Sequence, residues 1–243
     1  MANIKKLLSK NKLAIITCYD ASFAKLLEFI KVDAILVGDS LGLMIKGENN
    51  THKVTIEEVC YHTKSVRRGT DSLPIIADMP IGSFANKELA LFNSSKLIEA
   101  GADLIKIEGG LGVVGTVEFL NKNGVAVCGH IGYMPQNTLN SKKKYNVNII
   151  KKEAETLVKA GAKMLVLSML PREINEAVSK SIDIPLVTYR SESKGTGEVE
   201  VLYDLLGVSS KSINNTSTDN AESYSKLSFS SLKDFVTKVH NKT

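Results

Sequence analysis

Short runs of hydrophobic residues recur along the whole chain, and each run ends in Gly, Asp, Ser or Pro. Runs of this length between turn residues are typical of strands that are buried on both faces of a parallel sheet. The pattern predicts seven strands, at 13–20, 34–40, 74–80, 104–110, 126–132, 164–170 and 185–191. A weaker run at 201–208 is the candidate for an eighth strand.

Helical patterns occupy the segments between these runs. After the first strand, four hydrophobic residues have the spacing of one helix face: Phe23, Leu26, Leu27 and Ile30. Thr55 and Glu58 have the spacing of a capping box, which predicts that a helix begins there. Gly101 and Gly161 each stand between a helical pattern and a strand, as glycines that end helices do.

An internal repeat indicates how these units are arranged. Residues 99–108 and 159–168 match in pattern, which places Ser168 at the strand position that Glu108 occupies in the other copy. Repeated strand–helix alternation favours a closed (β/α)8 TIM barrel, predicted as one domain over residues 1–243; an open doubly wound sheet is the alternative. A polar stretch at 209–230 is predicted to be mobile, before a short helix at 231–240.

Composition narrows the cellular setting. Three cysteines, an odd and widely spaced set, argue against a disulfide framework, and no leader pattern is visible, so we expect a cytoplasmic protein. No hydrophobic run approaches the roughly 20 residues that span a bilayer. The net charge of +5 is modest, and the basic run 142–144 lacks interleaved aromatic residues. We therefore expect neither a membrane nor a nucleic acid partner.

Polar residues stand at the ends of the predicted strands. They are Asp20, Asp39, Ser40, Asp78, Lys106, Glu108, His130 and Ser168. In a barrel these strand ends share one mouth, where catalytic groups from several strands meet. The candidate active site therefore lies there.

Carboxylates at this mouth point to a hard cation. Asp39 and Asp78 are the best candidate ligands, with Glu108 beside them, and one or two carboxylates leave Mg2+ free positions for water and substrate. Strand-terminal aspartates that merely cap a following turn are the alternative. Lys106 and Glu108 are two residues apart on one strand and therefore point to the same side, where they could bind substrate or form a structural ion pair.

Two further motifs carry less weight. His130 and Cys128 share a strand face, but a lone Cys-x-His lacks the remaining ligands of a zinc site; a histidine hydrogen-bonded within the core is the structural alternative to a ligand contact. Gly110, Gly112 and Gly115 spell G-x-G-x-x-G, yet the next strand contains no acidic residue for a ribose. We interpret these glycines as loop and helix-start geometry.

Five segments together resemble the ketopantoate hydroxymethyltransferase family. They are VGDSLGLMIKG (37–47), YHTKSVRRG (61–69), IADMPIGSF (76–84), AGADLIKIEGG (100–110) and CGHIGYMPQ (128–136). The resemblance runs in order from about residue 11 to residue 136 and continues more weakly to Gly207.

The resemblance implies a TIM barrel of the phosphoenolpyruvate/pyruvate superfamily that forms a homo-oligomer, commonly a decamer. The implied reaction transfers a one-carbon unit from 5,10-methylenetetrahydrofolate to 2-oxoisovalerate and gives ketopantoate, a pantothenate precursor. By motif position, Asp39 and Asp78 match the Mg2+ ligands, and Glu108 lies near the metal through water. Ser40 and Lys106 match groups that hold the 2-oxo acid, and His130 matches a further contact.

Two departures from the family pattern affect the chemistry. At Ser168 family members carry a glutamate that is regarded as the general base, and TYRSE at 188–192 replaces a glycine-rich segment. Glu108, Glu173 and Glu192 are possible substitute bases. The departures leave two alternatives to a hydroxymethyltransferase: a Mg2+-dependent lyase or aldolase acting on another 2-oxo acid, or a catalytically impaired paralogue that binds a ligand or an active subunit.

Overall fold

The computed structural model describes residues 2–136, 145–191 and 195–209. Its eight parallel strands close into a barrel in chain order, so the predicted barrel is confirmed and the open sheet is wrong. The strands are β1 (Leu13–Thr17), β2 (Ala34–Val37), β3 (Ile75–Asp78), β4 (Leu104–Glu108), β5 (Val127–Gly132), β6 (Met164–Ser168), β7 (Leu186–Tyr189) and β8 (Gly197–Glu200).

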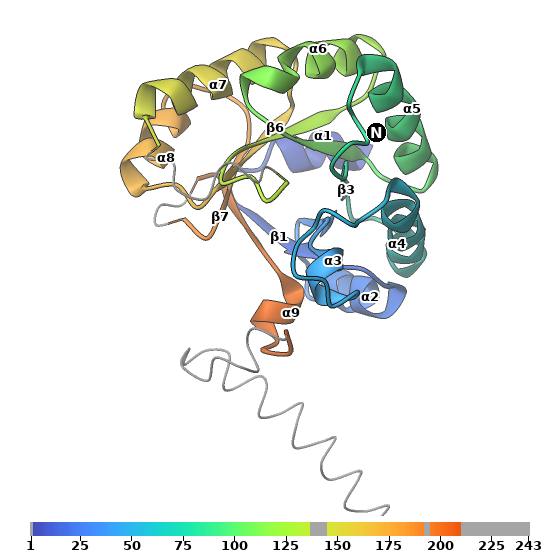
Figure 1. Ribbon diagram of the computed structural model, residues 1–243. Coiled ribbons are helices and arrows are strands. Elements are labelled where there is room, and N and C mark those ends of the chain that lie inside the picture. The colour runs from blue at the N-terminus through green and yellow to red at the C-terminus, as the bar shows by residue number, and fades with distance from the viewer. Residues whose placement is uncertain (1, 137–144, 192–194, 210–243) are drawn as a thin grey trace, which may run out of the picture. The chain divides into compact units, whose positions relative to one another are not determined.

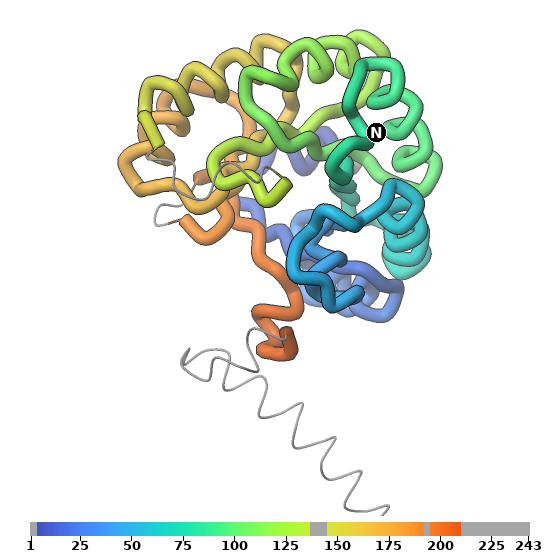
Figure 2. The backbone as a smooth tube through the Cα atoms, viewed as in Figure 1, coloured from blue at the N-terminus to red at the C-terminus, as the bar shows by residue number. Residues whose placement is uncertain are grey.

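Helices α2 to α8 follow the strands in turn and lie around the outside of the barrel, as the ribbon and the backbone tube show (Figures 1 and 2). The helices are α1 (Ala2–Leu8), α2 (Ala21–Phe29), α3 (Leu41–Met44), α4 (Ile56–Gly69), α5 (Lys87–Glu99), α6 (Val114–Lys122), α7 (Val147–Lys159), α8 (Arg172–Ser179) and α9 (Leu202–Leu205). The capping box is confirmed, because Thr55 and Glu58 exchange side-chain and backbone hydrogen bonds at the start of α4. Gly101 and Gly161 have φ of +110° and +103°, as predicted for residues that end helices.

The prediction for the eighth strand is wrong. The strand is Gly197–Glu200, and the run at 201–208 contains helix α9 instead. Leu202, Leu205 and Leu206 have helical spacing, whereas the strand sequence GEVE alternates with acidic residues and forms no continuous hydrophobic run. The alternation of residue types at 197–200 was the signal of the eighth strand, and the more continuous hydrophobic run at 201–208 was not.

The chain divides into two compact units, residues 1–199 and 200–243, of which the second is described from Glu200 to Ser209. The single domain over 1–243 stays a prediction. The predicted mobile stretch at 209–230, apart from Ser209, and the helix at 231–240 lie outside the described residues, as does the basic run 142–144.

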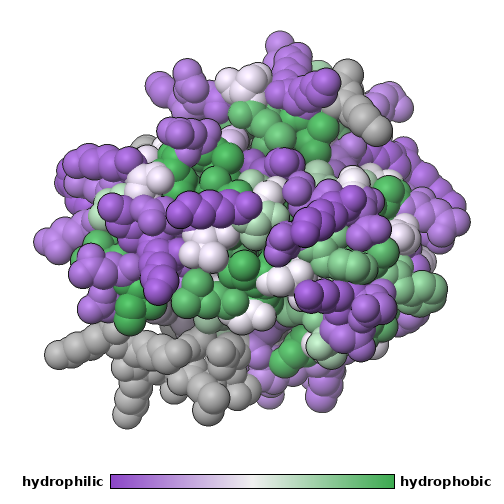
Figure 3. All heavy atoms as spheres, turned by 90° about the horizontal axis from the view of Figure 1, so that it is seen from above, coloured by the Kyte–Doolittle hydropathy of each residue, from purple (hydrophilic) through white to green (hydrophobic). Residues whose placement is uncertain are grey.

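Helix α2 buries a narrower face than its pattern indicated. Ala24 and Leu27 are buried, whereas Leu26 and Ile30 of the predicted face are exposed, together with Phe29 at 81%. On the side of the molecule drawn in Figure 3, hydrophobic side chains also lie in small groups between polar ones. Leu26, Phe29 and Ile30 have the spacing of one helix face, so their exposed side chains form a small hydrophobic group on α2.

Alternate residues of each strand point into the barrel and form its interior. This core contains Leu13, Ile15, Ala34, Leu36, Ile76, Leu104, Cys128, Met164, Val166, Val187 and Val199, with Leu7 of α1. Because side chains alternate along a strand, Asp78, Lys106 and Glu108 continue the inward-facing rows that begin at Ile76 and Leu104. The same parity places His130 and Ser168 on the inside, above Cys128 and Val166.

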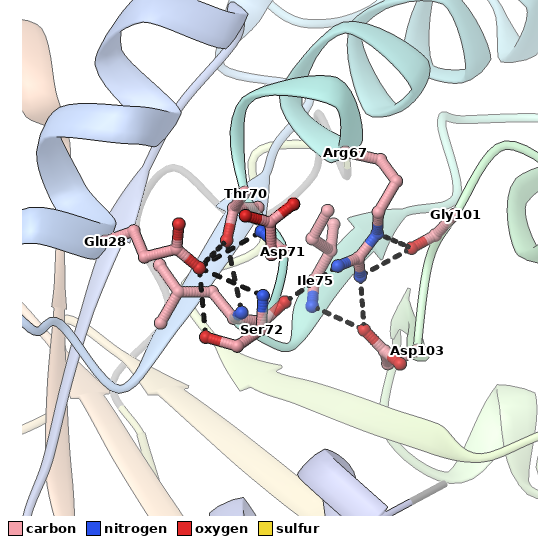
Figure 4. Close-up of polar contacts among 9 residues, drawn as sticks. Glu28, Arg67, Thr70, Asp71, Ser72, Ile75, Gly101 and Asp103 are labelled. Atoms are coloured by element: carbon pink, nitrogen blue, oxygen red, sulfur yellow. Dashed lines mark hydrogen bonds and ion pairs between the residues drawn. The ribbon is translucent and has the colours of Figure 1, made fainter.

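Polar contacts fasten the opposite end of the barrel, where the strands begin (Figure 4). Oε1 of Glu28 on α2 accepts hydrogen bonds from the Thr70 hydroxyl at 2.7 Å and from the Ser72 backbone N–H at 2.9 Å. Arg67 donates to Oδ2 of Asp103 at 2.6 Å, and the Ile75 N–H donates to the same oxygen. These contacts join α2 and α4 to the chain segments that enter β3 and β4.

Glu28→Gln is expected to lower the free energy of unfolding by about 1–2 kcal/mol at pH 7. The Thr70 hydrogen bond is the main cause that lowers the pKa of Glu28 from 4.5 to about 2. An acid whose pKa is depressed in the folded state stabilises above its unfolded pKa, so the deficit of the variant should shrink as the pH falls below 4.5. Urea unfolding at pH 7 and pH 4 measures the difference in the free energy of unfolding between the variant and wild type. Glu57→Gln, at an exposed site, is the control, and equal stability of Glu28→Gln and wild type at pH 7 would contradict the prediction.

Candidate active site

Five charged or titratable residues from four strands meet inside the barrel at its mouth. Asp39 follows β2, Asp78 ends β3, Lys106 and Glu108 lie on β4, and His130 lies on β5. Their exposed fractions are between 2% and 7%. Buried charged residues are rare unless they are paired or functional, and here they converge on one place.

Asp78 is the centre of the cluster. Its Oδ1 lies 2.5 Å from Lys106 Nζ, and its Oδ2 accepts the backbone N–H of Asp39 at 3.0 Å. Gly38 permits this approach, because a Cβ there would lie 3.3 Å from Asp78 Oδ2 and 2.9 Å from Ser40 Oγ. The ion pair between Lys106 and Asp78 therefore belongs to the mouth cluster.

Gln136 connects the cluster, and the strand-end pattern did not indicate it. Its side-chain Nε2 donates to Asp39 Oδ2 at 3.0 Å and to the Met79 carbonyl, and its backbone N–H donates to Glu108 Oε1 at 2.8 Å. Gln136 lies in a loop after Pro135 and not at the end of a strand. The signal that could have found it was its place in the segment 128–136.

Glu108 and His130 are unusual in their ionisation. Burial raises the pKa of Glu108 to about 7, and burial, followed by the positive charge of Lys106, lowers the pKa of His130 to about 3. His130 Nδ1 lies 3.2 Å from Glu108 Oε2. Neither ring nitrogen has a hydrogen bond of good geometry within residues 2–136, 145–191 and 195–209. His130 is therefore a neutral ring that can exchange hydrogen bonds with a ligand.

The cluster has an excess of negative charge. Asp39, Asp78 and Glu108 face a single ammonium, Lys106. Burial, followed by the charge of Asp78, raises the pKa of Asp39 to about 7, and the three carboxylates raise the pKa of Lys106 above its usual value although burial alone would lower it. A bound cation would relieve this excess.

The donor set fits Mg2+ better than zinc. In the described part of the chain, no three His, Cys, Asp or Glu side chains form a ready-made metal site. Mg2+ often binds through one or two carboxylates and retains water, which Asp39 and Asp78 could provide. Cys128 lies in the hydrophobic core and burial raises the pKa of its thiol to about 12, which is unfavourable for a zinc thiolate.

Ser40 has a partner that the sequence did not indicate. The hydroxyl of Tyr19 lies 2.8 Å from Ser40 Oγ and 3.3 Å from Thr17 Oγ1. Tyr19 is 1% exposed, and burial raises its pKa above the usual value. The pattern placed Tyr19 in a hydrophobic strand, which gave no reason to distinguish it from core residues.

The remaining predicted residues have different places. Asp20 caps α2 by accepting the Phe23 N–H, which is the structural alternative for such an aspartate. Ser168 is 2% exposed and is the last residue of β6, as Glu108 is the last residue of β4. The two therefore hold matching strand positions, as the repeat predicted. Glu173 lies exposed in the first turn of α8, and Glu192 lies outside the described residues.

The glycine motif has a structural explanation. Gly110 precedes a 3-10 helix at Leu111–Val113, and Gly115 lies in the first turn of α6. This geometry is what the interpretation as a loop and helix start predicted.

Comparison with known proteins decides the family. The sequence model of ketopantoate hydroxymethyltransferase matches residues 1–243. This chain belongs to the ketopantoate hydroxymethyltransferase family. Two relatives are named 3-methyl-2-oxobutanoate hydroxymethyltransferase. The protein of Alteromonas mediterranea is 39% identical over 85% of this chain and 81% of its own length, and that of Nitrosomonas eutropha is 42% identical over 83% and 78%.

Solved structures of other enzymes share the ketopantoate hydroxymethyltransferase barrel. A 2,3-dimethylmalate lyase of the PEP mutase/isocitrate lyase superfamily has a TM-score of 0.68 at 12% identity, covering 99% of this chain and 87% of that one. A phosphonopyruvate hydrolase, solved with oxalate and Mg2+, has a TM-score of 0.67 at 16% identity, covering 84% and 80%. These neighbours support the barrel fold. None of the helices described is long and hydrophobic enough to span a membrane.

Proposed function

We propose that this protein transfers a hydroxymethyl group from 5,10-methylenetetrahydrofolate to 2-oxoisovalerate, with Mg2+, and produces ketopantoate. Family membership supports the reaction class. The observation that carries the proposal is the buried cluster at the mouth. There the charges of three carboxylates act on one lysine, and the two ring nitrogens of the neutral His130 have no hydrogen-bond partner among the described residues. Such a site suits a divalent cation together with an anionic 2-oxo acid.

Asp39 and Asp78 would hold Mg2+, and Glu108 would contact it through water. When bound, Mg2+ polarises the keto group and thereby acidifies the neighbouring C3–H bond. The ammonium of Lys106, which its carboxylate neighbours keep protonated, would pair with the substrate's negative charge. The Ser40 hydroxyl, held by Tyr19, would donate a hydrogen bond to a substrate oxygen.

Proton removal from C3 needs a base, and Ser168 is a poor one. Among the substitutes, Glu108 is buried in the cluster, and its position is fixed by the Gln136 N–H. Its pKa of about 7 suits a group that accepts a proton near neutral pH. Glu173 is exposed on α8. We therefore assign proton removal to Glu108, whose Oε2 lies 3.2 Å from Nδ1 of the neutral His130 ring.

The overall reaction balances with water as a third reactant. The C3–H bond of 2-oxoisovalerate breaks, and C3 bonds to the methylene carbon, whose two C–N bonds to the folate break. Water supplies the new hydroxyl group. The proton from C3 and one from water end on the two folate nitrogens, which gives tetrahydrofolate.

The direct test incubates the protein with Mg2+, 2-oxoisovalerate and methylenetetrahydrofolate and measures ketopantoate by mass spectrometry. Formation of ketopantoate that EDTA abolishes and added Mg2+ restores is the expected result. Slow turnover of 2-oxoisovalerate with fast cleavage of another 2-oxo acid would instead identify a lyase or aldolase. Ligand binding without any turnover would identify an impaired paralogue. The homo-oligomer stays a prediction that sedimentation velocity can measure.

Ser168→Glu is expected to increase deuterium exchange at C3 of 2-oxoisovalerate by about tenfold to hundredfold, within the usual contribution of a general base. The reason is that the substitution places a carboxylate at the position where the family resemblance implies the general base. NMR of the substrate in deuterated water, without folate, measures this step alone. Ser168→Gln is the matched control for side-chain size. Exchange absent from wild type but present in Ser168→Glu would show that Glu108 does not act as the base.

A further inference from the structure

A cavity of about 560 Å³ adjoins the buried cluster. Glu108 and Gln136 line it, so it borders the same carboxylate that we assign as the base. Its other walls include Ile81, Leu111 and Met134. Ile81 is 41% exposed and Leu111 is 46% exposed, although both are large hydrophobic residues. Exposed hydrophobic side chains beside a polar site are typical of a wall that a ligand covers.

The cavity also has an acidic wall away from the cluster. Glu153 of α7 lines it, and the carboxyl group of Glu153 lies against the backbone of Gly110. A Cβ at Gly110 would lie 2.2 Å from Glu153 Oε1, so a side chain at this position would displace the carboxyl group. The absence of a side chain at Gly110 therefore allows the Glu153 carboxylate, a hydrogen-bond acceptor, to form part of the cavity wall.

These features define what the cavity can bind. Its hydrophobic walls suit a flat ring, and the Glu153 carboxylate accepts hydrogen bonds from a ring edge that carries adjacent N–H groups. The residues described as lining the cavity include no lysine or arginine, which disfavours a phosphate or a carboxylate tail as the group bound there.

We infer that this cavity binds the reduced pterin ring of the folate cosubstrate, with Glu153 accepting hydrogen bonds from the 2-amino-4-oxopyrimidine edge of the ring. The inference rests on the proposed function for the identity of the cosubstrate. It assigns the ring to the hydrophobic walls and the recognition of its N–H edge to Glu153. The methylene group would then face the cluster, because Glu108 and Gln136 belong to the cluster and also line the cavity.

Gly112 offers a way to fill the cavity without disturbing the fold. It lines the cavity, nothing lies within 4 Å of a Cβ built on it, and its φ is outside the range that strains other residues. Gly115, three residues on, does not line the cavity, and a Cβ there meets only the flexible Lys87 side chain at 3.4 Å. Gly112→Leu and Gly115→Leu are therefore a matched pair.

Calorimetry with tetrahydrofolate, in the absence of 2-oxo acid, tests the inference. Gly112→Leu should raise the Kd by tenfold or more, Gly115→Leu should leave it within twofold, and Glu153→Gln should raise it about tenfold through loss of the charged acceptor. In wild type, 6-methyltetrahydropterin should compete with tetrahydrofolate, whereas p-aminobenzoylglutamate should compete poorly.

Unchanged binding in Gly112→Leu, or competition by p-aminobenzoylglutamate but not by the pterin, would overturn the inference. Deuterium exchange at C3 needs no folate, so it reports on the proposed function separately. If wild type exchanges deuterium and all three variants bind tetrahydrofolate normally, the cavity assignment fails and the proposed function remains. If wild type shows no exchange and no ketopantoate, the proposed function fails, whatever the binding result.

Discussion

Asp78→Asn is expected to reduce the rate of ketopantoate formation by about 10³-fold or more. The substitution removes one of the two carboxylates proposed to hold Mg2+, and a Lewis acid contributes several kcal/mol to such a reaction. It also removes the charged partner of Lys106, which lies 2.5 Å from Asp78 Oδ1. Steady-state kinetics over a range of Mg2+ concentrations measures the loss, and calorimetry with Mg2+ alone should show weakened binding.

Asp103→Asn is the matched control for Asp78→Asn. Each aspartate pairs with one basic side chain and accepts one backbone N–H: Asp103 from Arg67 and Ile75, and Asp78 from Lys106 and Asp39. The two lie at opposite ends of the barrel. Asp103→Asn should lower the free energy of unfolding by about 1–2 kcal/mol and leave kcat unchanged. Similar kinetic losses in both variants would mean that Asp78 acts only through the fold.

Asp39→Asn is expected to stabilise the metal-free protein while it abolishes activity. Burial, followed by the charge of Asp78, raises the pKa of Asp39 from 3.8 to about 7 in the folded state. An acid with a raised pKa contributes nothing below its unfolded value. Its ionisation increasingly destabilises the folded state between pH 3.8 and 7, and the full penalty applies above pH 7. The variant should therefore exceed wild type at pH 8 by about 2–4 kcal/mol in the free energy of unfolding.

Urea unfolding in EDTA at pH 8 and pH 5 measures this gain, which should be much smaller at the lower pH. Saturating Mg2+ should stabilise wild type, because it binds only the folded state, and should have little effect on Asp39→Asn. Asp183→Asn, at an exposed site, is the control and should show neither effect. If Asp39→Asn were less stable than wild type at pH 8 without metal, ionised Asp39 would not destabilise the metal-free protein, and the prediction would be wrong.

The sequence predicted the barrel and most of its mouth because one rule governs both. Strands β2 to β6 are buried at every position, and β1 forms a hydrophobic run although Ala14 is exposed, so a polar residue that ends such a run is conspicuous. Asp39, Asp78, Lys106, Glu108 and His130 all lie inside the barrel as this rule indicated. The eighth strand was missed because acidic residues, Glu198 and Glu200, occupy alternate positions of β8 and interrupt the hydrophobic run.

The residues that sequence reasoning missed reach the site by other routes. Gln136 comes from a loop, and its role depends on how that loop folds back over Asp39 and Glu108. Tyr19 resembles a core residue until its hydroxyl is seen beside Ser40. Glu153 reaches the cavity from α7 only because Gly110 has no side chain. Contacts between distant segments of the chain carry no local periodicity, so no strand or helix pattern could indicate them.

Helix α1 has a consequence for the order of events at the site. Leu7 is part of the barrel interior, and Ile4 and Leu8 pack against that core, so the end where the strands begin is filled. Both reactants must then arrive from the mouth, and whichever lies deeper has to arrive first and depart last. With the 2-oxo acid in the buried cluster and the pterin in the outer cavity, this geometry favours sequential kinetics in which tetrahydrofolate dissociates before ketopantoate.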